Sequence, residues 1–333
     1  MVRRMTSAVL DGDGFTWRDG ERTIRFGRGA VATAHELTGD GYVLLTTARA
    51  RGTVPALEER AGAILEVPAG RVDEISAELL PRLQAAKNVT MSIVALGGGR
   101  VIDTAKALAA ATGRAVAAIP TTLSAAEMTW LHRQVAGLEP PPGFVRPRVV
   151  INDPELSASQ PEPELAASAG NSLGHAVEAP ITTLATPVPT LAAREAARLT
   201  AAAYSGAGEP DRDALALAAL LSGYAIDSAW YGLHHVMSQT LVRVGEVGHG
   251  QANSGLLPHT MRALQSRGLE LVADIALAEQ LADLAGTTHL AAFGVDDAVL
   301  DACADAAAQR PELANTPPPA DREELRRIYA AAL

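Results

Sequence analysis

The chain has 333 residues, of which 48% are hydrophobic and 20% charged, a composition typical of a globular protein long enough for two domains. Its formal net charge of −10 and isoelectric point near 5.3 argue against nucleic acid or an anionic membrane as a partner. The single cysteine, Cys303, excludes an intrachain disulfide. Because no secretory hydrophobic segment and no apolar run of roughly 18 residues occurs, we expect a cytoplasmic protein.

The N-terminal half alternates predicted strands with predicted helices. Residues 14–27 form a predicted β-ribbon; further strands are predicted at 42–47, 63–67, 89–96, 116–120 and 149–153, and helices at 28–38, 53–61, 71–87 and 101–112. This alternation predicts an α/β domain with an open, parallel, Rossmann-like sheet and helices on both faces. Ligands bind such sheets at the carboxyl ends of the strands.

Three consecutive glycines, Gly97, Gly98 and Gly99, join a predicted buried strand to a predicted helix. Glycines let the backbone approach a ligand closely, and the start of a helix offers N–H groups and a positive dipole end to a phosphate. A purely structural tight turn would use the same residues. Loops at the same sheet edge, after 42–47 and after 116–120, favour a phosphate-bearing ligand, although the standard Rossmann Gly-x-Gly-x-x-Gly fingerprint is absent.

The loop after the strand at 42–47 bears on the choice of nucleotide. Thr47 ends the strand, Arg49 and Arg51 follow, and no acidic residue precedes Glu58. In many dinucleotide sites an acidic residue here binds the ribose 2′-hydroxyl, whereas an arginine accommodates a 2′-phosphate. The pattern therefore predicts that NADPH is tolerated as well as NADH. The alternative is that both arginines are solvated loop charges.

The C-terminal half is predicted to be helical almost throughout. Helices are predicted near 162–183, 188–204, 211–243, 252–267, 270–286, 295–308 and 321–332. The change of pattern predicts an α/β domain over residues 1–153 and an all-helical domain over residues 154–333.

Polar residues gather on these apolar helices. Asn171 and His175 are four residues apart and therefore share one face of a helix, while His235 and His249 lie on other segments. Imidazole groups suit zinc or ferrous iron, so this set is compatible with a metal site. Each histidine taken alone is more typical of a structural residue.

Five motifs, taken in order, resemble the iron-containing (group III) alcohol dehydrogenase superfamily. They are Gly97-Gly-Gly…Asp103-Thr-Ala-Lys106, Pro120-Thr-Thr…Glu127-Met-Thr129, Asp153-Pro-Glu-Leu, Gly170-Asn…His175-Ala-Val-Glu-Ala and His235…Gly248-His-Gly250…Leu257-Pro-His. The resemblance covers nearly the whole chain. It implies the two-domain dehydroquinate synthase-like fold, with NAD(P) in the N-terminal domain, the reaction in the cleft against the helical domain, and a homodimer.

The resemblance also implies roles for single residues of the N-terminal domain. The residues that would bind the cofactor are Gly97, Gly98, Gly99 and Arg100 at the pyrophosphate, Thr121 and Thr122 near the nicotinamide and ribose, Thr47 and Arg49 at the ribose loop, and Asp103 and Lys106 at the family's Asp and Lys positions.

The sequence departs from the family on the catalytic side. The family's metal ligands, one Asp and three His, correspond to Asn171, His175, His235 and His249. An amide is a neutral and weaker ligand than a carboxylate for a divalent ion. A further family histidine, four residues after His235, is Gln239, and a glutamine cannot shuttle a proton.

Asn171, Thr47 and the segment Gly232-Leu-His-His235 resemble the maleylacetate reductase branch, which reduces the C=C bond of maleylacetate with NADH or NADPH and is thought to work without a bound metal. We therefore expect an NAD(P)H-dependent reductase acting on a small, carboxylated substrate. His235, His175 or His249 would polarise the substrate or relay a proton, and Asn171 would donate a hydrogen bond.

Several alternatives stay open at this point. Gln239 and the loop Leu123-Ser-Ala-Ala depart from that branch too. A metal-dependent alcohol dehydrogenase would hold iron or zinc on His175, His235 and His249. A lyase or cyclase similar to dehydroquinate synthase, or a nucleotide-binding relative without chemistry, would use the same scaffold.

Overall fold

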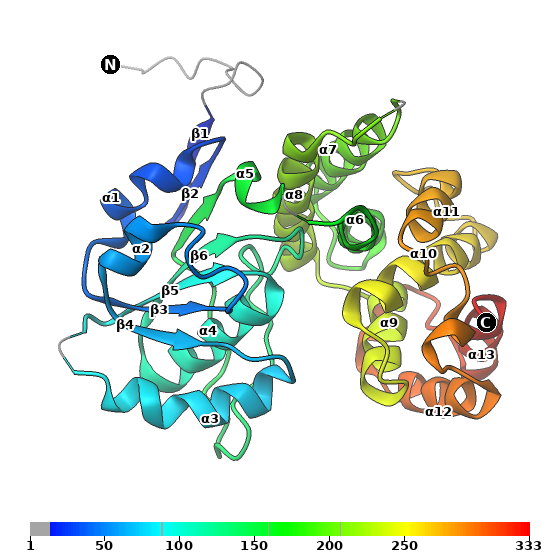
Figure 1. Ribbon diagram of the computed structural model, residues 1–333. Helices are drawn as coiled ribbons and strands as arrows, with labels where there is room; N and C mark the ends of the chain where they lie inside the picture. The colour runs from blue at the N-terminus through cyan, green and yellow to red at the C-terminus, as the bar shows by residue number, and fades with distance from the viewer. Residues whose placement is uncertain (1–13, 88, 159, 207) are drawn as a thin grey trace. The chain divides into compact units, whose positions relative to one another are not determined.

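The computed structural model describes residues 14–87, 89–158, 160–206 and 208–333, and it divides into two compact units, Met1–Ser159 and Gln160–Leu333 (Figure 1). The sequence analysis placed the boundary after residue 153, whereas the short helix α5 (Pro154–Ser157) belongs to the first unit. Among the described residues, no helix combines the length and the apolar character that crossing a membrane requires.

The first unit is built on a seven-stranded sheet in the order β1-β2-β7-β6-β5-β3-β4. The strands are β1 (Phe15–Asp19), β2 (Arg22–Phe26), β3 (Tyr42–Thr46), β4 (Ala61–Glu66), β5 (Ser92–Gly97), β6 (Ala115–Pro120) and β7 (Val149–Asn152). Only β1 and β2 pair antiparallel; the other pairs are parallel. The predictions of a parallel sheet and of a β-ribbon over residues 14–27 are confirmed, and the structure places the ribbon at one edge of the sheet.

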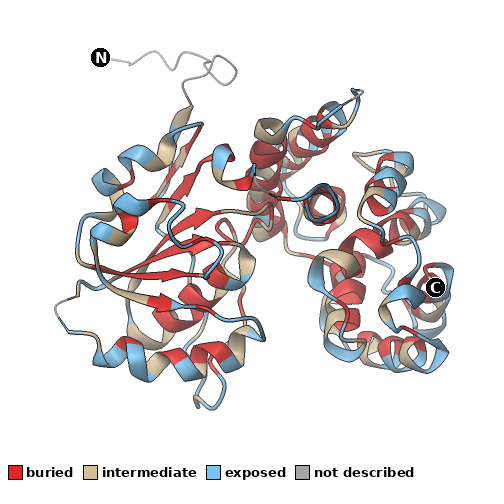
Figure 2. Cartoon of the chain, in the orientation of Figure 1, coloured by how far each residue is buried: buried red, intermediate tan, exposed pale blue. Residues whose placement is uncertain are grey.

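Both faces of this sheet are covered, because alternate strand residues are apolar on each side. Val43, Ile93 and Val116 pack with α3 (Val72–Ala85) and α4 (Gly99–Thr112). The intervening residues, such as Leu44, pack on the other face with the segment that contains η1 (Ala30–Thr33), α1 (His35–Thr38) and α2 (Pro55–Glu59). The strands form the buried layer in Figure 2.

The strand register explains why three loops lie at one edge of the sheet. Thr46 at the end of β3 pairs with Leu96 of β5, and Gly97 pairs with Pro120 of β6. The strands therefore end level with one another. The loops after Thr46, Gly97 and Pro120 leave the sheet side by side, as the sequence predicts.

The second unit is entirely helical among its described residues, as predicted. Its helices are α6 (Glu162–Glu178), η2 (Ala179–Ile181), α7 (Pro187–Ala203), α8 (Arg212–Ala229), α9 (Leu233–Val244), α10 (His249–Ser266), α11 (Ile275–Leu284), η3 (Leu290–Phe293), α12 (Asp297–Ala308), η4 (Pro311–Asn315) and α13 (Arg322–Ala331). Helix α6 is buried along nearly its whole length, so its polar residues lie inside the unit.

The single helix predicted over 211–243 is wrong, because the structure has two helices there. Helix α8 ends at Ala229, Trp230 has a positive φ of 60°, and α9 begins at Leu233. A side chain at Gly232 would collide with Thr316, whose Oγ1 accepts the Leu233 N–H at 3.3 Å. The apolar pattern continues through the break, so periodicity alone does not reveal it.

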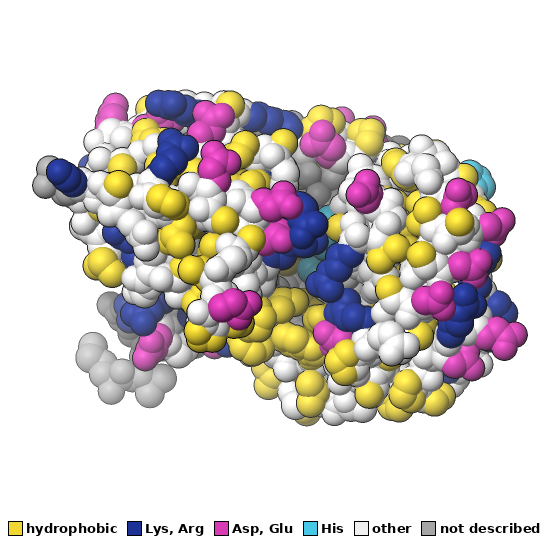
Figure 3. All heavy atoms as spheres, turned by 90° about the horizontal axis from the view of Figure 1, so that it is seen from below, with side chains coloured by type: hydrophobic (Ala, Val, Ile, Leu, Met, Phe, Trp, Pro, Cys, Tyr) yellow, Lys and Arg dark blue, Asp and Glu magenta, His cyan; other side chains and the backbone are white. Residues whose placement is uncertain are grey.

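Acidic and basic side chains are interspersed over the molecular face drawn in Figure 3.

The loop after β6 is held from inside the first unit by Lys106 of α4. This side chain is fully buried, and its ammonium donates to the carbonyl oxygens of Ala126 and Thr129 at 3.0 Å and of Leu131 at 2.9 Å. Its Nζ also lies 2.8 Å from Asp103 Oδ1. A buried ammonium needs such partners, so the loop is fixed to α4. The structure thus places Lys106 behind the loop, where it positions the chain.

The same loop contains a buried carboxyl group, Glu127. Glu127 is only 1% exposed to solvent, and its Oε2 atom has no hydrogen-bond partner among the described residues. Burial raises the pKa of Glu127 from 4.5 to about 7, although Lys106 and Arg22 partly oppose the shift. The charged form is therefore unfavourable in the folded state.

We expect the Glu127→Gln variant to show a pH-dependent gain in stability. A carboxyl whose pKa is higher in the folded state than in the unfolded state costs stability as the pH rises from about 4.5 to about 7. The glutamine has no such cost, so the variant's advantage should grow by about 2 kcal/mol between pH 5 and pH 8. Urea unfolding at both pH values measures it, with the exposed Glu66→Gln as control; an equal difference at both pH values would contradict the prediction.

Candidate active site

The glycine turn of the first unit is a bare backbone segment at the start of α4. Gly98 is the residue before the helix, and among the described residues no side chain caps this helix start. A Cβ on Gly98 would lie 3.0 Å from the Oγ1 and Cγ2 atoms of Thr122. The turn and the Thr121–Thr122 loop are thus packed too closely for a side chain. This leaves the uncapped N–H groups of the helix start suited to a phosphate.

The loop after β3 contacts a carboxylate, Glu58, that lies beyond it in the sequence. Thr47 Oγ1 accepts the Ala50 N–H at 3.2 Å. Glu58 of α2 returns to the loop, where its Oε1 accepts the Gly52 N–H at 2.5 Å and its Oε2 lies 3.4 Å from Arg51 Nε. Arg51 is therefore paired within the protein. Arg49 and, at the start of α4, Arg100 have exposed side chains.

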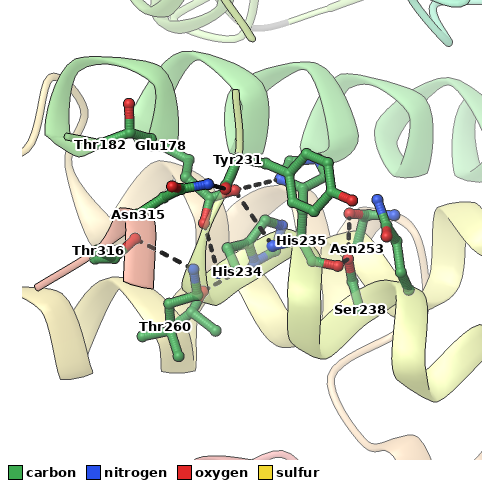
Figure 4. A network of polar contacts seen from close by, with 12 residues as sticks. Glu178, Thr182, Tyr231, His234, His235, Ser238, Asn253, Thr260, Asn315 and Thr316 are labelled. Carbon is green, nitrogen blue, oxygen red and sulfur yellow. Dashed lines mark hydrogen bonds and ion pairs between the residues drawn. The ribbon is translucent and has the colours of Figure 1, made fainter. Parts of the chain in front are cut away.

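Glu178, the last residue of α6, organises the site of the second unit (Figure 4). It is fully buried, and its Oε1 accepts the His234 N–H at 2.7 Å. Its Oε2 accepts the His235 N–H at 3.3 Å and lies 2.6 Å from His235 Nδ1. The first N–H groups of a helix have no partner inside the helix and favour an anion. Glu178 therefore caps α9 from a different helix.

The same contact fixes the orientation and tautomer of His235. An ionised carboxylate only accepts hydrogen bonds, so His235 Nδ1 donates to Glu178. His235 Nε2 is buried and, among the described residues, has no partner. Glu178 holds the ring through Nδ1, so Nε2 can exchange a hydrogen bond or a proton with a ligand.

His234 occupies a different, internal position. Thr260 Oγ1 donates to the backbone carbonyls of Leu256 and Leu257, so it accepts the bond from His234 Nδ1 at 3.0 Å. The other ring nitrogen, Nε2, also has no partner among the described residues, but it lies against Gly174 of α6. Burial lowers the pKa of His234 well below its ordinary value, and the ring is neutral. We regard it as a packing residue.

The predicted residues of α6 lie next to His235. The rings of His175 and His235 stack with their centroids 4.7 Å apart and their planes 14° from parallel. Burial, followed by the neighbouring His235, lowers the pKa of His175 well below its ordinary value, so this ring is neutral. His175 Nδ1 and Asn171 Oδ1 are buried and have no partner among the described residues. Unpartnered buried polar atoms point to a ligand that would satisfy them.

His249, at the start of α10, completes the predicted set. Asn253 Nδ2 donates to the His249 carbonyl oxygen at 2.8 Å and lies 3.3 Å from its Nε2. Asn253 Oδ1 accepts the Ser238 hydroxyl at 2.9 Å, which links α10 to α9. The electrostatic influence of His249 extends to both His175 and His234. The fold therefore gathers residues of α6, α9 and α10 that are far apart in sequence.

This arrangement does not fit a bound iron or zinc ion. Within the described part of the chain, no group of three or more His, Cys, Asp or Glu side chains is placed to hold a metal ion. The lone pair of an imidazole lies in its ring plane, so the nearly parallel, stacked rings of His175 and His235 do not converge on one ion. Asn171 supplies no charge, and the nearby carboxylate, Glu178, is engaged by α9.

Comparisons with known proteins agree with this architecture. The family profile described as "Fe-containing alcohol dehydrogenase family, C-terminal" matches residues 165–333, and that described as "Iron-containing alcohol dehydrogenase" matches residues 48–129. The chain is 34% identical over 238 residues to maleylacetate reductase 1 of Rhodococcus opacus, which covers 66% of this chain and 67% of that protein. It is 32% identical over 213 residues to 1,3-propanediol dehydrogenase of Citrobacter freundii, a match that covers 56% of this chain and 55% of that protein.

Solved structures show the same fold. The crystal structure of maleylacetate reductase from Agrobacterium tumefaciens matches with a TM-score of 0.81 and 26% identity, covering 96% of this chain and 97% of that one. The expected resemblance is confirmed. The chain belongs to the iron-containing alcohol dehydrogenase family, in its maleylacetate reductase branch, and is an oxidoreductase.

Proposed function

We propose that the protein is an NAD(P)H-dependent reductase of the maleylacetate reductase type, which acts without a catalytic metal on an activated C=C or C=O bond of a small carboxylated substrate. The observation that carries the proposal is the buried His235 Nε2, which has no partner among the described residues and is backed by Glu178. Such a pair suits the transfer of one proton to a substrate that receives a hydride.

The cofactor would supply that hydride. Gly97, Gly98, Gly99 and Arg100 would hold its pyrophosphate, and Thr121 and Thr122 would lie near its nicotinamide and ribose. Lys106, with Asp103 beside it, would act by fixing the loop, because its ammonium is already bonded to three carbonyl oxygens. The close packing of Gly98 against Thr122 supports a shared role for the turn and this loop.

The residues of the second unit would manage the charge that appears on the substrate. When a hydride adds to an enone, negative charge develops on the carbonyl oxygen and one proton must then be delivered. His235 in its protonated form would supply this proton, and the Glu178 carboxylate would stabilise that form. Asn171 would donate a hydrogen bond, and His249 and the neutral ring of His175 would complete the polar lining.

Metal-dependent alcohol dehydrogenase activity is the second candidate, favoured by the similarity to 1,3-propanediol dehydrogenase. One experiment separates the two. Protein purified without chelator is analysed for metals and assayed by nicotinamide absorbance with maleylacetate, other enones, keto acids, aldehydes and 1,3-propanediol.

We expect NAD(P)H oxidation with maleylacetate or a related carboxylated enone, and no stoichiometric iron or zinc. Stoichiometric metal together with oxidation of the diol would establish the alcohol dehydrogenase instead. NADPH binding without turnover of any compound would exclude the reductase. The oligomeric state, which we propose to be a homodimer, is measured on the same sample by light scattering.

The Glu178→Gln variant should lose most of its turnover. The amide cannot stabilise a protonated His235 and presents an N–H₂ group to one of its donors, so kcat should fall about 10²- to 10⁴-fold. The KM for the nucleotide should not change, because its residues belong to the other unit. Steady-state kinetics on folded protein, with circular dichroism as the check, measures both values.

Thr260→Val is the matched control for this variant. Thr260→Val removes the hydrogen-bond partner of His234, just as Glu178→Gln alters the partner of His235. Valine and threonine are similar in shape, so the packing around His234 is kept. We expect a much smaller effect on kcat, since His234 faces the interior. Equal losses in the two variants would show that Glu178 acts only through packing.

The Thr47→Asp variant should turn the enzyme away from NADPH. A carboxylate at the end of β3 would repel a 2′-phosphate and accept hydrogen bonds from ribose hydroxyls. The ratio of kcat/KM for NADPH to that for NADH should fall about tenfold or more, which is about 1.4 kcal/mol. The neutral Thr47→Asn is the control, and an unchanged ratio in Thr47→Asp would remove the ribose role from this loop.

A further inference from the structure

Gln239 lies one helical turn after His235 on α9, so the two side chains share a face of the helix. Its Oε1 accepts a hydrogen bond from Arg310 Nη2 at 3.2 Å. This contact fixes the otherwise ambiguous amide, with the oxygen toward the guanidinium. The amide N–H₂ group is therefore left to donate elsewhere.

Arg310 is locked along one edge of its guanidinium. Nε and Nη2 each lie 3.0 Å from an oxygen of Glu312, and the Tyr231 hydroxyl lies 3.1 Å from Nη2. The two hydrogens of Nη2 are therefore shared among Glu312, Tyr231 and Gln239. The Tyr231 hydroxyl in turn donates to Glu312 at 3.0 Å. The ring of Tyr231 lies 6.1 Å from that of His235, so this network adjoins the site.

The Nη1 group, at the other end of the guanidinium, has no such partner among the described residues. Nη1 is buried, and the Arg310 side chain is only 15% exposed. Leaving two N–H donors of a charged group buried and unpaired is unfavourable, so such a group points to a ligand. A carboxylate accepts two hydrogen bonds at once and is the usual partner of an arginine.

We propose that Arg310 Nη1 and the Gln239 amide bind a carboxylate of the substrate, at a distance from the reacting bond. The pair makes the site selective for carboxylated compounds. This inference rests on the proposed function for the identity of the substrate, but the anchor itself can be tested without turnover. Glu312 occupies the Nε and Nη2 edge of the guanidinium, so the ligand would be bound through the N–H groups of Nη1.

The test uses adipate, a six-carbon dicarboxylate that cannot be reduced at a C=C or ketone group, in titration calorimetry with the full chain. Arg310→Lys keeps the charge opposite Glu312 but loses the forked donors. We expect its Kd for adipate to rise about 10- to 100-fold. Gln239→Glu, whose new carboxylate would pair with Arg310, should weaken binding to a similar extent without leaving Glu312 unpaired.

Arg326→Lys is the matched control, because Arg326 is also paired with carboxylates, Asp297 and Asp301, and is 22% exposed. Its Kd for adipate should equal that of the parent chain. Absence of adipate binding in the parent, or an unchanged Kd in both Arg310→Lys and Gln239→Glu, would overturn the anchor.

Kinetics with maleylacetate separate the anchor from the proposed function. If the parent turns over maleylacetate, Arg310→Lys should raise its KM by the same factor as the Kd. If the parent binds adipate in an Arg310-dependent way yet reduces no enone, the anchor stands and the proposed reaction fails. If turnover proceeds with an unchanged KM in Arg310→Lys, the reaction stands and the anchor fails.

Discussion

The contact of Glu178 with the start of α9 is the interaction on which the helical unit depends. Three N–H groups of two adjacent residues meet one buried carboxylate, which lies at the end of the most deeply buried helix. The break after Ala229 creates the helix start that the carboxylate satisfies. The same oxygen that caps the backbone also holds the His235 ring. The same carboxylate therefore fixes both the packing of α9 and the orientation of His235 Nε2, so a change in one changes the other.

Burial decides the electrostatic character of the cluster around that contact. It keeps His175 and His234 neutral, and Asn171 stands where the family pattern has a carboxylate. The groups of the cluster that can carry charge are therefore the Glu178 carboxylate and His235 in its protonated form. Such a site stabilises developing negative charge through hydrogen bonds. A divalent ion would need converging lone pairs and a further anionic ligand, and the stacked rings provide neither.

Local sequence patterns were sufficient for the framework. The β-branched runs of the first unit, the triple glycine and the i, i+4 spacing of Asn171 and His175 each follow from one short segment. Features that depend on distant partners were not accessible: the collision of Gly232 with Thr316, the return of Glu58 to the ribose loop, and the burial of Lys106. Glu178 was visible as a charge at the end of an alanine-rich helix, but its partners lie more than fifty positions away.

The two departures from the family pattern in the second unit make sense together. By the resemblance, Asn171 and Gln239 both stand where the family has a group that handles charge or protons, and each is an amide that only forms hydrogen bonds. Oxidation of an alcohol requires a proton to leave along a relay, which a glutamine interrupts. Reduction of a carboxylated enone requires one proton to be delivered, and this is the role that we propose for His235 with Glu178. Gln239 has no proton to transfer, so its amide, oriented by Arg310, is available for the substrate carboxylate that we propose it binds.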